Sequence, residues 1–161
     1  MEVFVARQPI FNEFEKIVGY ELLYRNKREN FFPDIDSDVA TVDVLINTFL
    51  SIGIDEVAQG KPAFVNFSGN LLNSSVFDYI EPSKVIIEIL EDVEITPALI
   101  NRVEELKRRG YKIALDDFIF SDSYKEQRDI FSVIDYIKID FSDGFAETVV
   151  NNVSRLSEGD K

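Results

Sequence analysis

The sequence contains no cysteine and no histidine. Without cysteine the chain can form neither disulfides nor thiolate metal sites. Without histidine it lacks the commonest general base and the commonest transition-metal ligand. Any bound metal must therefore be held by oxygen atoms, which points to Mg, Mn or Ca.

Long apolar runs are also missing. No segment approaches the roughly 18 apolar residues of a membrane span. The first residues lack the basic region and apolar stretch that mark a secretory signal. We therefore expect a cytoplasmic protein without membrane contact, and 161 residues fit a single domain with a hydrophobic core.

Positive charge is scarce, because 17 Lys and Arg residues face 30 Asp and Glu residues, for a net charge of -13. Binding to a long nucleic acid depends on basic side chains that neutralise phosphates, so we expect no such partner. A small phosphate ligand held through metal ions remains compatible with this charge. The plain alternative is that the acidity serves solubility alone.

The predicted elements begin with a hairpin. Residues 2–10 and 16–25 have strand character, and a short polar connection joins them, so we expect an antiparallel pair. A helix is predicted next, from an N-cap at Asp36 or Ser37 to Gly53.

From residue 63 onward, predicted strands and helices alternate. The expected strands span residues 63–67, 84–90, 111–116 and 133–140. The expected helices span residues 70–79, 97–109 and 146–156, with a short one within 118–131. The clearest helix has Thr96 as N-cap, Pro97 in its first turn and Gly110 after its end. Such alternation predicts a parallel sheet with right-handed crossovers, in either a doubly wound sheet or a (β/α) barrel.

Five successive predicted strands each carry a polar residue in the C-terminal part of an apolar run. These residues are Glu21, Asn66, Glu88, Asp116 with Asp117, and Lys138. One such residue alone is usually a satisfied polar group in the core. In barrels, however, the C-terminal ends of the strands meet at one face, which favours the barrel. We then expect one oxygen-rich cluster suited to one or two hard divalent cations.

Two of these positions need a partner. Glu21 lies in mid-strand among apolar neighbours, and Arg25 on the same face could pair with it. The adjacent carboxylates of Asp116 and Asp117 repel each other. Taken alone, that pair fits either a solvated acidic turn or a cation site.

The polar residues and their neighbours resemble the motifs of the EAL domain family, which hydrolyses the bacterial second messenger cyclic di-GMP. The segments, in chain order, are RQPI (7–10), GYELLYR (19–25), VNFS (65–68), EILE (88–91), ALDDF (114–118) and IKID (137–140). Leu22 stands where the name-giving motif has Ala, and Leu90 where the family has Thr. The segments at residues 4–11, 20–25, 85–92 and 114–118 are most similar to a divergent subgroup in which an EAL domain precedes an HDOD domain.

The resemblance implies a fold and a set of roles. The fold would be an incomplete TIM-type barrel with an antiparallel first strand and about six of eight strands, a single truncated EAL-like domain over residues 1–161 without an HDOD domain. Glu21, Asn66, Glu88 and Asp116 would hold Mg or Mn. Asp117 would hold a second metal or the attacking water, and Lys138 would orient that water or offset negative charge. The ligand would contact Gln8 and Arg25, and Glu91 would brace the loop after the fifth strand.

Two departures from the family shape the functional hypotheses. Ile119-Phe120 stands where active members have a glycine-rich loop, and Ile and Phe cannot adopt glycine's backbone angles. The later strands of a full barrel of about 250 residues are absent, so we expect open sheet edges that pair with a second copy or a partner protein. We expect a degenerate, regulatory EAL domain that binds ligand or protein without efficient turnover. The alternatives are an active metal-dependent phosphodiesterase that yields pGpG, and a scaffold that binds no ligand.

Overall fold

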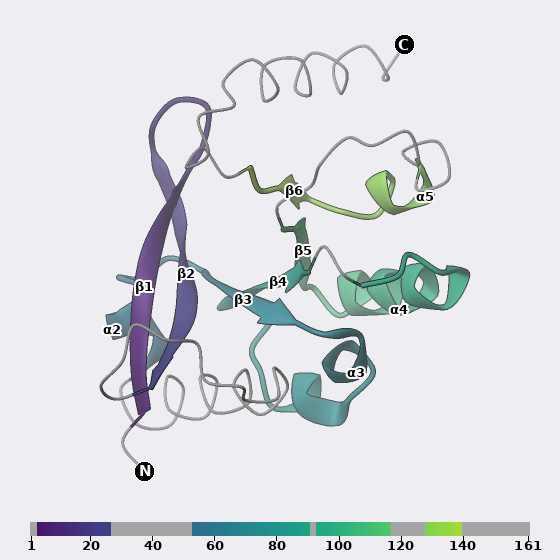
Figure 1. Cartoon of the computed structure of the whole chain (residues 1–161), viewed down its shortest axis with the longest axis horizontal. Coiled ribbons are helices and arrows are strands. Elements are labelled where there is room, and N and C mark those ends of the chain that lie inside the picture. Colours follow the sequence, from purple (N-terminus) through teal and green to yellow (C-terminus); the bar gives the residue numbers. More distant parts are fainter. Residues whose placement is uncertain (1–2, 27–52, 91–92, 117–127, 140–161) are drawn as a thin grey trace.

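One mixed sheet of six strands organises the chain. The computed structural model describes residues 3–26, 53–90, 93–116 and 128–139 (Figure 1). The sheet order follows the sequence order, β1-β2-β3-β4-β5-β6. The strands are β1 (Val3–Phe11), β2 (Ile17–Asn26), β3 (Ala63–Phe67), β4 (Val85–Ile89), β5 (Lys112–Leu115) and β6 (Tyr136–Ile137).

The pairing of the strands confirms the predicted topology. β1 runs antiparallel to β2, whereas every later neighbouring pair is parallel. The sheet curls into part of a barrel, with β1 at one end and β6 at the other. The C-terminal ends of β2 to β6 therefore lie at one rim of the curl, as a (β/α) barrel requires.

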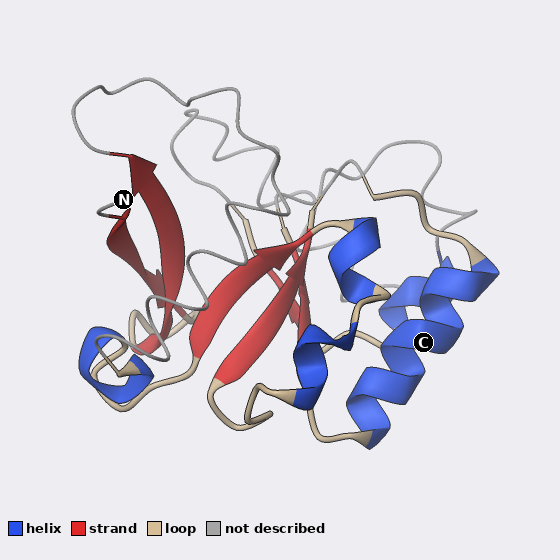
Figure 2. Cartoon of the chain, turned by 90° about the horizontal axis from the view of Figure 1, so that it is seen from below, coloured by secondary structure: helices blue, strands red, loops and turns tan. Residues whose placement is uncertain are grey.

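Short helices connect the parallel strands. They are α2 (Ile54–Val57), α3 (Gly69–Leu72), the 3₁₀ helix η2 (Ser75–Asp78), α4 (Pro97–Arg108) and α5 (Arg128–Phe131). Figure 2 shows the helices between β3 and β6 along one side of the strands. None of the helices in the described ranges is long and apolar enough to cross a membrane.

Helix α4 forms as predicted. The Thr96 side chain accepts a hydrogen bond from the Leu99 amide at 3.2 Å, and Pro97 occupies the first turn. Gly110 follows the helix with a φ of 98°, a left-handed conformation that costs glycine little. The face that carries Leu99, Val103 and Leu106 is buried.

Two predicted elements differ clearly in extent from those of the structure, and one helix was not predicted. The helix expected over residues 70–79 is divided into α3 and η2, because the Ser74 hydroxyl donates to the Leu71 carbonyl and accepts from the Val76 amide. β6 is shorter than residues 133–140, because the Asp135 carboxylate accepts the Ile113 amide in place of a ladder partner. Helix α2, which follows Gly53 directly, was not predicted from the sequence. The helices expected over 37–53 and 146–156 lie outside the described residues, apart from Gly53 itself.

The two faces of the sheet bury different residues. Toward the helices, β3, β4 and β5 present apolar side chains that form the main core, among them Val65, Phe67, Ile87, Ile89 and Ile113. Toward the inside of the curl, Phe64, Ile86 and Ala114 form a second, smaller buried cluster with Ile10, Val18 and Tyr136 packed against it. This inner cluster supports the polar residues described next.

Candidate functional site

The five polar positions expected from the sequence lie on the inner face of the sheet. Glu21 belongs to β2, Asn66 to β3 and Glu88 to β4, while Asp116 follows β5 and Lys138 follows β6. The strand register places Asn66 beside Glu88. Backbone bonds extend the ladder past the strand ends, because the Asp116 amide donates to Ile89 O at 3.0 Å and the Lys138 amide donates to Leu115 O at 2.9 Å.

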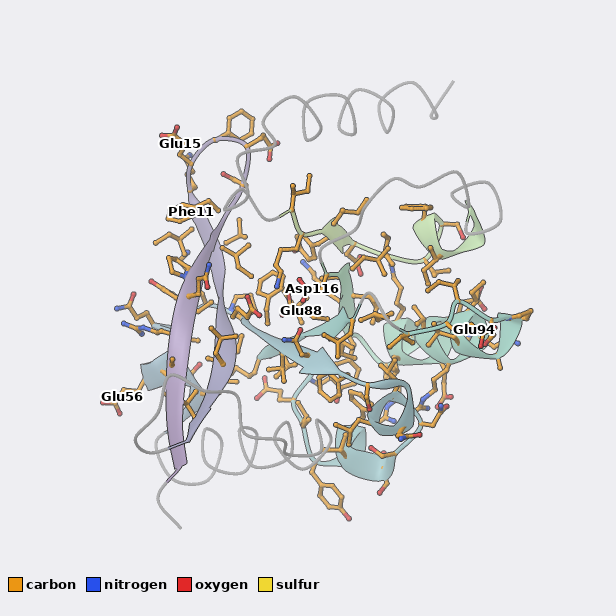
Figure 3. The ribbon with its side chains drawn as sticks, in the orientation of Figure 1. Phe11, Glu15, Glu56, Glu88, Glu94 and Asp116 are labelled. Carbon is orange, nitrogen blue, oxygen red and sulfur yellow. The ribbon has the colours of Figure 1, made fainter. Side chains whose placement is uncertain are left out.

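The Lys138 ammonium joins three carboxylates from three different strands. Its Nζ lies 3.0 Å from Glu21 Oε2, 3.0 Å from Glu88 Oε1 and 2.6 Å from Asp116 Oδ1. Asn66 Nδ2 donates to the other oxygen of Glu21 at 3.4 Å. Figure 3 shows Glu88 and Asp116 next to each other near the middle of the sheet. The predicted convergence is therefore present in the structure.

Glu88 is the most deeply buried member of this site. Its side chain has no solvent exposure, and its Oε2 atom has no hydrogen-bond partner among the described residues. Burial raises the pKa of Glu88 to about 8, the nearby Lys138 opposes that rise, and the negative charge of Glu21 adds to it. An unsatisfied, fully buried carboxylate oxygen is costly, and positions of this kind are typical of functional sites.

Two opposing effects act on the pKa of the Lys138 ammonium. Burial lowers this pKa, but the adjacent carboxylates of Glu88, Asp116 and Glu21 outweigh burial and raise it above its ordinary value. Lys138 is therefore a permanent cation at neutral pH. Three ionised carboxylates and one ammonium would carry a net charge of about -2, which is reduced when Glu88 is protonated.

An apolar floor that was not predicted from the sequence lies beneath the polar residues. The floor is made of one residue from each of four strands, and each lies two positions before the polar residue of the same strand. These residues are Phe64, Ile86, Ala114 and Tyr136. The rings of Phe64 and Tyr136 meet edge to face with centroids 5.8 Å apart. Since side chains alternate along a strand, the residue two positions before each polar residue was the signal that could have identified this floor.

Gly19 makes room for that floor. A Cβ atom at position 19 would lie 2.5 Å from the Phe64 ring and 2.7 Å from the Pro62 carbonyl oxygen. Only glycine permits this close approach of β2 to β3. Gly19 thus holds Glu21, two residues further on, within reach of the groups on β3 and β4.

The structure describes only some of the remaining predicted site residues. Gln8 is exposed on β1, and its backbone is paired with that of Glu21. The backbone of Arg25 is paired with Phe4 in the hairpin, but the Arg25 side chain lies outside the described part. Lys138 and Asn66 are the partners that the structure gives Glu21. Asp117 and Glu91 lie outside the described residues.

The donor set of this site matches a hard cation in its chemistry. Three carboxylates and one amide offer only oxygen donors, and Glu88 Oε2 is a buried acceptor with no hydrogen bond among the described groups. No three acidic side chains within the described ranges form a ready-made metal-binding group. In their present arrangement, the Lys138 ammonium offsets part of the negative charge of these carboxylates.

Two curated relatives match most of this chain. Over 143 residues, 88% of the chain, it is 51% identical to the uncharacterized protein YuxH of Bacillus subtilis. Over 138 residues, 85% of the chain, it is 36% identical to the cyclic di-GMP phosphodiesterase CdgJ of Vibrio cholerae. The chain spans only about a third of these relatives, 35% of YuxH and 31% of CdgJ. No family model matches the chain.

Solved structures of EAL proteins share the fold. The YkuI protein of Bacillus subtilis, with an EAL domain in complex with substrate c-di-GMP and calcium, matches 98% of this chain with a TM-score of 0.63 and 23% identity. A standalone EAL protein from Vibrio cholerae in its c-di-GMP-bound form matches 98% with a TM-score of 0.60 and 18% identity. The chain covers 46% of the first and 77% of the second.

Proposed function

We propose that this chain, which has the fold and relatives of the EAL domains, is a degenerate regulatory domain of cyclic di-GMP signalling. It binds the dinucleotide or a partner protein without efficient turnover. The observation that supports this proposal most is that five polar side chains lie together on the inner face of the sheet. They are Glu21, Asn66, Glu88, Asp116 and Lys138. A cytoplasmic location follows from the proposed second-messenger ligand.

A divalent cation, Mg or Mn, is part of this proposal. Glu21, Asn66, Glu88 and Asp116 would hold it, since they offer oxygen donors at neighbouring strand ends. Such a cation would supply Lewis-acid stabilisation of a phosphodiester and activation of water. Lys138 offsets part of the negative charge of the carboxylates and is protonated at neutral pH.

The ligand contacts proposed for the other residues follow from the family resemblance. Gln8 is exposed, and its backbone lies beside that of Glu21, which supports a contact between Gln8 and the ligand. We assign ligand contact to Arg25 and the bracing of the loop after β5 to Glu91. Asp117 would hold a second cation or the attacking water.

Weak or absent turnover is proposed because of one feature of the sequence. Ile119-Phe120 replaces the glycines that active members have after the Asp-Asp-Phe segment. The presence of the three carboxylates of the site with a lysine is the observation that favours the second candidate, an active phosphodiesterase producing pGpG.

Binding and product analysis test these functions together. The chain is titrated with cyclic di-GMP in Mg or Mn, and the mixture is analysed for linear pGpG. We expect binding without turnover, and weaker binding by Glu21→Gln than by Glu13→Gln, an exposed control in the hairpin turn. Turnover would establish the phosphodiesterase instead, and neither binding nor turnover would establish a scaffold.

Association through the sheet ends is the remaining part of the proposal. Among the described strands, β1 and β6 each pair on one side only. Unpaired strand edges favour pairing with another chain, so we propose a homodimer or a partner protein at these edges. Analytical ultracentrifugation over a range of concentrations should show a dimer for the chain alone, and a monomer at high concentration would contradict self-association.

A further inference from the structure

The Lys138 ammonium lies close to all three carboxylates of the site and donates a hydrogen bond to Glu21 Oε2 at 3.0 Å. An ammonium group has three N–H donors, and Nζ has one carboxylate oxygen within 3.0 Å from each of Glu21, Glu88 and Asp116. The lysine therefore makes the set of contacts that a small cation would make at this place.

These contacts are formed almost without water. The Lys138 side chain is 14% exposed, and the three carboxylate side chains are 12%, 0% and 9% exposed. At such burial the attraction between an ammonium and a carboxylate is several times stronger than in water. The repulsion between two cations that share the same carboxylates is strengthened in the same way.

Lys138 lies just beyond the last residue of β6 and not in the interior of a strand. β6 comprises Tyr136 and Ile137 only, and Lys138 follows it with an amide bond to Leu115 O at 2.9 Å. The lysine side chain is therefore anchored chiefly by its charged end. A change at that end can move it without disrupting the ladder.

We propose that Lys138 is a built-in counter-cation that competes with a divalent cation for Glu21, Glu88 and Asp116. Binding of the divalent cation displaces the Lys138 ammonium, so the lysine sets how tightly the site holds metal. This inference rests on the proposed function for the existence of a divalent site, and it adds the regulation of that site by one side chain.

Manganese binding by two lysine variants tests the competition. Calorimetric titration with MnCl₂ compares the unaltered chain, Lys138→Met and the charge-preserving Lys138→Arg. We expect Lys138→Met to bind Mn²⁺ about tenfold more tightly or better, because one repelling charge has been removed. Lys138→Arg should bind no more tightly than the unaltered chain.

Thermal unfolding gives an independent measure on the same proteins. Without metal, Lys138→Met should have a lower Tm than the unaltered chain, because three carboxylates then lack their cation. Added Mn²⁺ should raise the Tm of Lys138→Met more than that of the unaltered chain. A purely structural lysine would predict a lower Tm that Mn²⁺ does not restore, and that result would overturn the proposal.

Chemical labelling covers the case in which Lys138→Met fails to fold. Acetylation of lysines in the unaltered chain, read by peptide mass spectrometry, should increase at Lys138 when Mn²⁺ is bound. Labelling of the exposed Lys16 should stay constant. Unchanged labelling of Lys138 at saturating Mn²⁺ would overturn the competition.

The outcomes separate this inference from the function on which it rests. If the unaltered chain binds Mn²⁺ and Lys138→Met binds no more tightly, the competition is wrong and the divalent site stands. If neither protein binds Mn²⁺, the divalent site itself is wrong, and the competition is rejected with it.

Discussion

The two faces of the sheet are buried to a similar degree, but they differ in chemistry. Val65, Phe67, Ile87 and Ile89 on the helix side are at most 2% exposed and have only apolar side chains. On the inner side, Glu88 has no exposure at all, yet it is an acid beside a lysine. Burial alone therefore does not distinguish a core from a site. The difference is that the outer face is stabilised by contact area, whereas the inner face depends on charge balance.

The outer face should respond most strongly to loss of volume. Phe67 has no exposure, and its ring centroid lies 5.0 Å from that of Phe77. Phe67→Ala should lower the free energy of unfolding by about 3–5 kcal/mol, because it removes buried contacts and leaves a cavity. Urea unfolding measures this loss. Phe14→Ala, at a side chain that is 71% exposed, is the matched control and should cost less than about 0.5 kcal/mol.

The inner face should make the free energy of unfolding depend on pH. The raised pKa of Glu88 sets the sign of that dependence. Its pKa is about 8 in the folded chain against an ordinary 4.5, so the folded state binds a proton that the unfolded state has lost. This stabilisation is complete below pH 4.5 and is lost as the pH rises through about 8. Each pKa unit corresponds to about 1.4 kcal/mol.

Glu88→Gln should flatten the decrease in unfolding free energy between pH 5 and pH 8. The charged groups that face Glu88 are Glu21, Asp116 and Lys138. Glu13→Gln, at an exposed residue of the hairpin turn, should leave the pH dependence unchanged. An identical slope in Glu88→Gln and the unaltered chain would show that charge balance does not distinguish the inner face.

A smaller loss of stability is expected at Gly19, where the inner face depends on close packing. Gly19→Ala places a methyl group 2.5 Å from the Phe64 ring and should lower the unfolding free energy by about 1–3 kcal/mol. Gly69→Ala, whose methyl group would meet only Val93 at 4.0 Å, is the control. Equal stability of the two variants would mean that β2 and β3 can separate without cost.

Local signals in the sequence predicted the elements whose causes are local. The strand Ala63–Phe67 and the start of α4 at Pro97 have their predicted bounds, since apolar runs and capping residues act over a few positions. The wrong bounds had causes of another kind. Asp135 accepts the Ile113 amide of the neighbouring strand, a contact across 22 positions that no local pattern reveals.

The site was predictable in its members but not in its connections. The position of each polar residue near the end of an apolar run indicated that the strands would bring them together. The sequence suggested Arg25 as a partner of Glu21, and the side chain of Arg25 lies outside the described part. The partner that the structure shows is Lys138, 117 positions further along the chain than Glu21. Which oxygen the ammonium meets depends on the curl and register of five strands, and a linear pattern does not specify these.

The strand order has a consequence for how the chain assembles. Because each strand pairs with the one that precedes it in sequence, the sheet can grow one strand at a time as the polypeptide leaves the ribosome, N-terminal strands first. Glu21, Glu88 and Asp116 are then in place before β6 docks. Their mutual repulsion opposes the sheet that lacks β6, and the arrival of Lys138 relieves part of it. Lys138 thus stabilises the sheet that includes β6 relative to the sheet that ends at β5.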